Sequence, residues 1–158
     1  MGADSRAGLR GARRVIAVDT NILVYAHRED ASWHRLAYAR LAELAEGRSA
    51  WGVPWPCIHE FLSIVTHPRI FAPPTPTGAA IEQVEAWLEA PTLVLLAESG
   101  SHWAQARALL EAGRIAGPLV PDARIAALCI QNGVKELWSA DRDFGCFPAL
   151  VVVIPLVA

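Results

Sequence analysis

Acidic residues follow the short apolar runs of this chain, and that placement constrains both its fold and its chemistry. The apolar residues 15–18 stop at Asp19, and a second strand-like run, 136–140, stops at Asp141. Asp122 stands where a helix is expected to begin. Carboxylates gathered at one edge of a sheet repel one another and do not all ionise unless a cation lies among them. The pattern therefore predicts a cluster of acids around a divalent metal ion.

Strand-like and helix-like segments alternate along the whole chain. The apolar spacing predicts strands at about 15–18, 49–53, 92–97, 136–140 and 151–154, and helices at about 20–28, 33–46, 57–66, 78–89, 101–112 and 122–132. Such alternation produces a parallel sheet with helices on both faces. The apolar fraction of 53% agrees with parallel strands buried on both sides, and the run at 92–97 is expected to be one of them. A length of 158 residues predicts a single α/β domain.

The expected helix at 33–46 has apolar residues at helical spacing. Ser32 is expected to cap the helix at 33–46. Its core-facing residues are then expected to be Leu36, Ala39, Leu41, Leu44 and Ala45.

Each acid could also have a purely structural role instead of binding a metal ion. Asp19 and Asp122 stand where N-cap residues stand, and Asp is a good N-cap. Glu60 could be a solvated charge on the polar face of its helix, and Asp141 with Asp143 could form a polar turn. These explanations stay open for each acid alone, but together they require several independent coincidences.

Asp122 is the most informative of the acids. It shares the i, i+3, i+4, i+7 face of its helix with Ile125, Ala126 and Cys129, so it is expected to point along a buried stripe. It also lies at the helix amino end, where the helix dipole stabilises an anion. A carboxylate in this position is suited to bind a ligand.

Phosphodiester hydrolysis with Mg²⁺ or Mn²⁺ is the chemistry that such acids favour. Hard cations prefer carboxylate and water oxygens, and they activate water and stabilise the leaving oxygen. Asn21, two residues after Asp19, is expected to orient that carboxylate or a water molecule. No glycine-rich phosphate loop and no protein nucleophile is evident.

Charge is distributed unevenly between the amino end and the rest of the chain. Residues 1–14 carry four arginines and one aspartate, a net charge of +3, and since the whole chain is −2 the remainder is −5. We interpret residues 1–14 as a flexible basic extension, and favour an extension without a role over one that contacts RNA. The acidic remainder is compatible with a nuclease whose metal ions neutralise its centre.

The cysteines and the apolar runs bear on where the protein works. Cys57, Cys129 and Cys146 are widely spaced and odd in number, which matches neither a zinc site nor a disulfide framework. No signal peptide is visible, and no apolar run approaches the roughly 20 residues that span a bilayer. A cytoplasmic protein without membrane association is expected.

Four segments together resemble a known family. They are residues 19–25 (DTNILVY), 56–61 (PCIHEF), 122–128 (DARIAAL) and 139–144 (SADRDF). In this order and spacing they resemble a PIN domain, and more narrowly the VapC toxins of bacterial type II toxin–antitoxin pairs. The resemblance covers about residues 15–156.

The resemblance implies a three-layer α/β/α fold around a parallel sheet and a Mg²⁺- or Mn²⁺-dependent endoribonuclease. Its substrate would be structured RNA such as tRNA or rRNA, whose cleavage inhibits translation. A homodimer is implied, held inert by a VapB-type antitoxin whose tail enters the active-site groove. The catalytic acids of the family fall on Asp19, Glu60, Asp122 and Asp141. Asp19, Asp122 and Asp141 are also expected to bind metal.

Two further site residues follow from the same resemblance. Asp143 is implied as an additional metal ligand. Ser139 stands where the family often has Thr, and because the hydroxyl is kept, it is expected to hydrogen-bond and position an acid of the site.

Cations and aromatic rings near these segments are candidates for RNA contact. Phosphate recognition requires positive charge, and the arginines near the motifs are Arg28, Arg69, Arg124 and Arg142. Arg142 has an equal alternative, a salt bridge to Asp143. Trp51, Trp55 and Trp138 could stack on bases, but core or dimer-interface packing is the commoner role for such residues.

Three other functions are compatible with parts of the pattern. A stand-alone PIN ribonuclease of RNA maturation would have the same acids and no antitoxin gene beside it. A haloacid-dehalogenase-like phosphatase would need a second Asp two residues after Asp19, where this chain has Asn21. A non-catalytic assembly module would use the acids only to hold a structural cation, and the complete acid set argues against it.

Overall fold

A five-stranded parallel sheet forms the centre of the protein. The structure is a computed structural model and describes residues 15–156; the proposed extension at residues 1–14 lies outside this range. The strands are β1 (Ile16–Val18), β2 (Trp51–Pro54), β3 (Leu93–Leu96), β4 (Glu136–Trp138) and β5 (Val151–Val153), in the order β3-β2-β1-β4-β5. All neighbouring strands are parallel, as the alternating pattern predicts.

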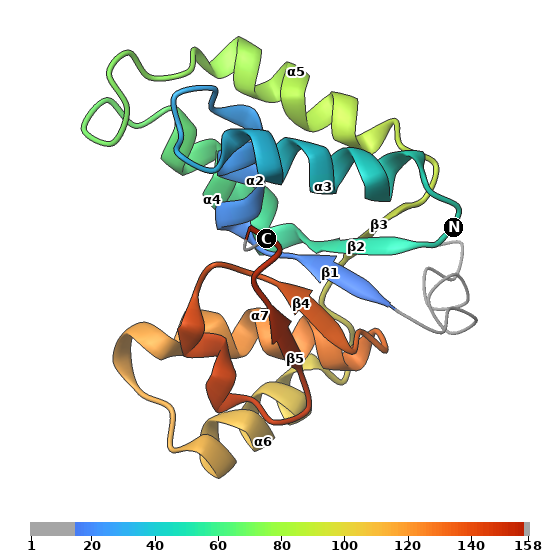
Figure 1. Cartoon of the computed structure of the whole chain (residues 1–158). Helices are drawn as coiled ribbons and strands as arrows, with labels where there is room; N and C mark the ends of the chain where they lie inside the picture. Colours follow the sequence, from blue (N-terminus) through green and yellow to red (C-terminus); the bar gives the residue numbers. More distant parts are fainter. Residues whose placement is uncertain (1–14, 157–158) are drawn as a thin grey trace.

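Helices cover both faces of this sheet. They are α2 (Thr20–His27), α3 (His34–Glu46), α4 (Trp55–Val65), α5 (Thr77–Leu88), α6 (His102–Gly113) and α7 (Val120–Gln131), with short 3₁₀ turns η1 (Gly117–Leu119) and η2 (Arg142–Cys146). Figure 1 shows α2 to α5 above the sheet and α6 and α7 below it. Right-handed crossovers explain this division, because the chain moves one way through β1, β2 and β3 and then returns to β4. The predicted three-layer α/β/α architecture is confirmed.

The site lies at the carboxyl ends of β1 and β4, which are neighbours because the chain returns across the sheet after β3. β1 pairs with β2 on one side and with β4 on the other, and Val18 aligns with Trp138. The backbone N–H of Asp19 donates to the carbonyl oxygen of Trp138 at 2.9 Å. Connections leave β1 and β4 in different directions here, and ligands of open parallel sheets bind at such switch points, beyond the carboxyl ends of the strands.

Three local expectations were wrong in whole or in part. β3 is an edge strand, so three of its four residues are only partly buried and Leu96 alone is fully covered. In α3 the prediction is right for Leu41, which is buried, and for Leu44 and Ala45, which pack against the core, but Leu36 is 40% exposed and Ala39 is exposed. Ala37 is the buried residue that the prediction missed. The N-cap of α3 is Trp33 rather than Ser32.

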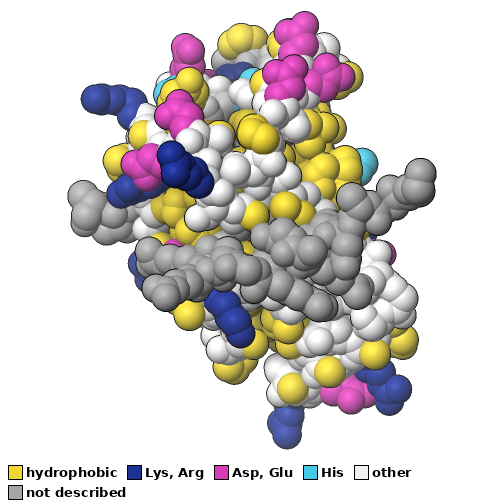
Figure 2. All heavy atoms as spheres, turned by 90° about the vertical axis from the view of Figure 1, so that its right-hand side faces the viewer, with side chains coloured by type: hydrophobic (Ala, Val, Ile, Leu, Met, Phe, Trp, Pro, Cys, Tyr) yellow, Lys and Arg dark blue, Asp and Glu magenta, His cyan; other side chains and the backbone are white. Residues whose placement is uncertain are grey.

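The surface away from the carboxyl edge mixes apolar and charged side chains. Figure 2 turns toward the viewer the side from which β1 enters the sheet, and hydrophobic side chains show in several places between charged ones. Large exposed apolar residues include Tyr38 at 61% and Trp103 at 67%. Among residues 15–156, no helix has both the length and the apolarity needed to cross a bilayer.

Candidate metal centre at the carboxyl edge of the sheet

Asp19 is the buried acid of the site. It follows β1 and precedes α2, and only 5% of its surface is exposed. Its Oδ2 accepts a hydrogen bond from the Ser139 hydroxyl at 2.7 Å, and its Oδ1 accepts one from the Cys57 thiol at 3.6 Å. The side chain occupies the N-cap position of α2 but makes no capping hydrogen bond. Capping therefore does not explain this carboxylate.

Ser139 links Asp19 to the segment that carries the next acids. Its Oγ donates to Asp19 and accepts from the backbone N–H of Asp141 at 2.9 Å. Asn21, expected to orient Asp19 or a water molecule, instead accepts from the backbone N–H of Ala140 at 3.1 Å through its Oδ1. Both side chains therefore hold residues 139–141 against the end of β1.

Three further acids lie together at this edge. Asp122, Asp141 and Asp143 each present a carboxylate oxygen, and these three oxygens lie within 4.8 Å of one another. Asp122 is in the first turn of α7, whose N-cap is Leu119, so Asp122 is not the N-cap. Asp141 caps η2 by accepting from the N–H of Asp143 at 2.9 Å, so the polar-turn explanation holds for this pair alongside the clustering.

Burial and mutual repulsion shift the protonation of these acids. Partial burial and the neighbouring charges of Asp141 and Asp19 raise the pKa of Asp122 to about 6. Burial, opposed mainly by the Ser139 hydrogen bond, raises the pKa of Asp19. The all-ionised cluster is thus unfavourable by itself, and a cation among the carboxylates would relieve it.

Glu60 reaches the cluster from another helix. It lies on α4, and its Oε2 accepts a hydrogen bond from the Thr20 hydroxyl at 3.1 Å. Its negative charge contributes to the raised pKa of both Asp19 and Asp122. Although its side chain is exposed, this contact places it beside the acids and not on a remote polar face.

The structure brings together all five predicted acids, although not with equal closeness. Asp122, Asp141 and Asp143 form the tight group, while Asp19 and Glu60 are held next to it by Ser139 and Thr20. The donors are carboxylate oxygens, which suit a hard cation such as Mg²⁺ or Mn²⁺. The set therefore fits the metal that the sequence predicts.

The four candidate arginines fall into two groups. Arg28 pairs with Asp30 at 2.6 Å and lies 4.3 Å from the ring centre of Phe71. Arg124 pairs with Glu98 at 2.6 Å, which leaves less of its charge available for a phosphate.

Arg69 and Arg142 are exposed. Within residues 15–156 neither forms an ion pair with an acid. The alternative salt bridge between Arg142 and Asp143 is therefore wrong, and Arg142 is an exposed residue of η2 between Asp141 and Asp143.

Only one of the three candidate tryptophans is accessible. Trp51 is 1% exposed and Trp138 is 8% exposed, so neither ring can stack on a base. Trp55 is 37% exposed at the start of α4, and its ring centre lies 6.3 Å from that of His59.

Cys57 and Thr20 were not predicted as site residues. Cys57 contacts Asp19, and Thr20 contacts Glu60. A weak signal exists in the sequence, because Cys57 precedes Glu60 by one helical turn and Thr20 directly follows Asp19.

Comparisons with known proteins identify the family of this chain. A PIN domain family model matches residues 16–148. Ribonuclease VapC43 of Mycobacterium tuberculosis is 35% identical over 136 residues, which are 86% of this chain and 92% of that protein. The match excludes the phosphatase alternative.

Solved structures show the same fold at lower identity. VapBC2 from Rickettsia felis, bound to a DNA fragment from its promoter, has a TM-score of 0.61 at 18% identity and covers 88% of this chain and 97% of that one. Mycobacterium tuberculosis VapC20, a toxin that cleaves the sarcin–ricin loop, has a TM-score of 0.60 at 16% identity over 82% and 92% of the two chains. The chain therefore belongs to the PIN-domain family, among the VapC ribonucleases.

Proposed function

We propose that this protein is the toxin of a toxin–antitoxin pair, a metal-dependent endoribonuclease that cleaves structured RNA such as tRNA or rRNA in the cytoplasm and so inhibits translation. The observation that carries the proposal is the buried Asp19, held by Ser139 beside the close group of Asp122, Asp141 and Asp143. The similarity to VapC ribonucleases supports the same activity. Ribosomal RNA is a reasonable class of target because VapC20, similar in fold, cleaves the sarcin–ricin loop.

The acids divide the work of the site. Asp19, Asp122 and Asp141 would hold Mg²⁺ or Mn²⁺, with Asp143 as an additional ligand and Glu60 facing the same space. A bound ion of this kind activates water and stabilises the charge that develops on a phosphate. Ser139 fixes the direction of one Asp19 oxygen, and Asp122, with a pKa raised to about 6, is poised to exchange a proton near neutral pH when no cation is bound.

Arg142 is proposed to contact the RNA backbone next to the acids. Arg142→Ala is expected to raise the KM for RNA about threefold to tenfold while kcat stays within twofold, because a phosphate contact contributes binding and not chemistry. Arg48→Ala is the matched control, since Arg48 is also exposed but precedes β2, at the opposite edge of the sheet. Steady-state cleavage at two salt concentrations measures both constants. An unchanged KM and an unchanged salt dependence in Arg142→Ala would refute this contact.

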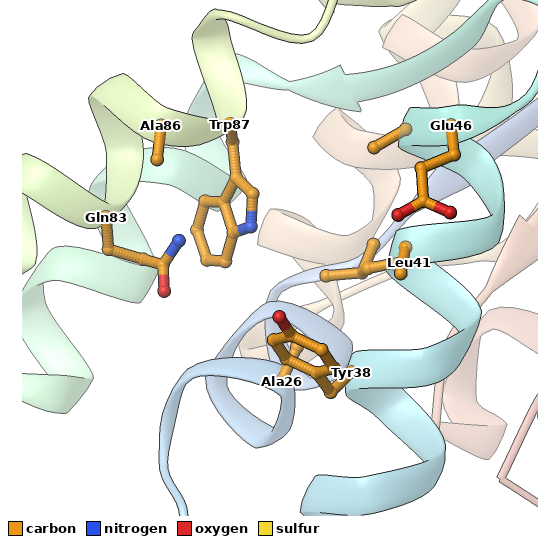
Figure 3. A pocket seen from close by; sticks show the side chains of 9 residues that line it. Ala26, Tyr38, Leu41, Glu46, Gln83, Ala86 and Trp87 are labelled. Atoms are coloured by element: carbon orange, nitrogen blue, oxygen red, sulfur yellow. The ribbon is translucent and has the colours of Figure 1, made fainter.

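An antitoxin and a second copy of the chain are the proposed partners. A hollow of about 250 Å³ lies between α3 and α5, with Leu41, Ala45 and Trp87 in its walls and Tyr38 at its side (Figure 3). Glu46 and Gln83 also line this hollow, and its apolar part would hold apolar side chains of an antitoxin segment. The exposed Trp33, Leu36, Leu88 and Trp103 provide further apolar surface for a homodimer or an antitoxin.

The experiment that tests the proposed function is cleavage of total cellular RNA by the purified protein. It is run with Mn²⁺ or Mg²⁺ and again with EDTA. Discrete fragments that require the metal are expected, and mapping their ends would identify the target. Absence of cleavage after any co-purified antitoxin has been removed by denaturation and refolding, with tRNA and rRNA both present, would contradict the proposal. A small open reading frame beside the gene would separate a toxin from a ribonuclease of RNA maturation.

A further inference from the structure

Two hydrogen bonds connect α4 to the junction between β1 and α2. The Cys57 thiol donates to Asp19 Oδ1 at 3.6 Å, and the Thr20 hydroxyl donates to Glu60 Oε2 at 3.1 Å. Asp19 and Thr20 are adjacent in the chain, and Cys57 and Glu60 are one turn apart on α4, so both bonds lie on the same helix face. Each bond joins an acid on one element to a neutral donor on the other.

The donors of both bonds are shielded from water. Cys57 is 0% exposed and Thr20 is 4% exposed. Water cannot easily replace a hydrogen bond that is lost at such a position, so an acceptor left without its donor is costly.

We infer that Cys57 and Thr20 are positioning residues of the metal centre. With the Ser139 bond to Oδ2 and the Cys57 bond to Oδ1, both oxygens of Asp19 are oriented by a donor. Thr20 directs the otherwise exposed Glu60 toward the same space. Neither residue is expected to contact the metal or the RNA. The inference rests on the proposed function, because it assigns these residues to the metal site of the ribonuclease.

Core packing alone is the alternative role of Cys57, and the chain contains a matched control. Cys129 on α7 is also 0% exposed, and within residues 15–156 its thiol makes no hydrogen bond. Cys129→Ala therefore removes a buried sulfur, as Cys57→Ala does, but it removes no hydrogen bond to an acid. A difference between the two variants reports the hydrogen bond and not the lost volume.

The test is a Mn²⁺ titration of the full-length, metal-free protein by calorimetry, together with steady-state RNA cleavage. Cys57→Ala is expected to weaken Mn²⁺ binding about tenfold, and Thr20→Val by roughly three- to tenfold, in line with other residues that orient metal ligands. In both, kcat falls while the KM for RNA stays within about twofold, because these residues act on the centre and not on RNA binding. Cys57→Ser and Thr20→Ser keep a donor and are expected to retain affinity near that of the unmodified protein, as is Cys129→Ala.

Several results would overturn the inference. One is that Cys57→Ala binds Mn²⁺ as tightly as Cys129→Ala does, and that Thr20→Val binds Mn²⁺ as tightly as Thr20→Ser does. If Cys57→Ala does not fold, the Thr20 pair alone decides. If the unmodified protein binds Mn²⁺ and cleaves RNA but the variants match it, the positioning roles fail and the proposed function stands. If the unmodified protein neither binds Mn²⁺ nor cleaves RNA, the proposed function and this inference fail together.

Discussion

Asp19→Asn is expected to abolish RNA cleavage, with kcat/KM reduced about a thousandfold or more, while the protein stays folded. In metal-dependent nucleases the metal ion and its ligands supply several kcal/mol of transition-state stabilisation, and each 1.36 kcal/mol corresponds to a factor of ten in rate. Asn has nearly the shape of Asp and can still accept the hydrogen bond from Ser139, which in the unmodified protein is 2.7 Å long. The change therefore removes one negative charge and places an amide nitrogen, which is a donor, where Oδ1 accepts from the Cys57 thiol; the Cys57 sulfur can accept from that N–H.

The fold of this variant is expected to survive because Asp19 is a buried charge. Burial raises its pKa, which means that the ionised form is disfavoured in the absence of a cation. Circular dichroism and thermal melting without metal should give a melting temperature equal to or above that of the unmodified protein. Glu82→Gln on α5 serves as a control, since this exposed acid lies outside the cluster. Full ribonuclease activity in both Asp19→Asn and Asp122→Asn would refute the proposed site.

The sequence predicted the layers of the fold and the composition of the acid cluster for one physical reason. An apolar run that ends in an acid indicates where a strand stops and which side chain lies at the edge of the sheet. Asp19 and Asp141 could therefore be predicted to lie at the same edge from the parallel pattern alone. Asp122 could be added because it shares a helix face with buried residues. Glu60 carried no such signal by itself, and its inclusion depended on the other acids of the set; its catalytic role was implied by the resemblance to the family.

The features that could not be predicted depend on contacts between distant segments. Asn21 bonds to Ala140 and not to Asp19, because the pairing of β1 with β4 brings that backbone N–H within reach. Arg124 pairs with Glu98, 26 residues away in the chain, because the segment after β3 lies beside α7. The pairing of Arg28 with Asp30 is local by contrast. Position along the chain identifies which cations are near the motifs, but only the fold decides which of them are already paired.

In the absence of metal, the protein is expected to lose stability as the pH rises from about 4 to about 7. The ordinary pKa of an aspartate is 3.8, and that of Asp122 in the folded protein is raised to about 6. The folded state therefore holds this proton more tightly than the unfolded state. Below pH 3.8 both states are protonated and no penalty exists; between the two values the unfolded state loses its proton first, so the free energy of unfolding falls until about pH 6 and then levels off.

The size of this effect is limited by solvent around Asp122. A shift of about two pKa units corresponds to at most roughly 3 kcal/mol, and screening of a partly exposed group reduces it to about 1 to 2 kcal/mol. For a domain of this size, that is a loss of roughly 2 to 8 °C in melting temperature. Asp122→Asn cannot ionise at this position, so its metal-free stability at pH 7 should exceed that of the unmodified protein and depend less on pH.

With Mn²⁺ bound, the unmodified protein is expected to become more stable than Asp122→Asn. A ligand that binds only the folded state at about 100 times its Kd adds roughly 2.7 kcal/mol of stability, and the gain should be larger at pH 7 than at pH 5 because protons compete for the same carboxylates. Thermal unfolding of both proteins at pH 5 and pH 7, each with EDTA and with Mn²⁺, provides the comparison. If Asp122→Asn is no more stable than the unmodified protein in EDTA at pH 7, and Mn²⁺ stabilises both equally, then repulsion among these acids neither destabilises the free site nor attracts the metal.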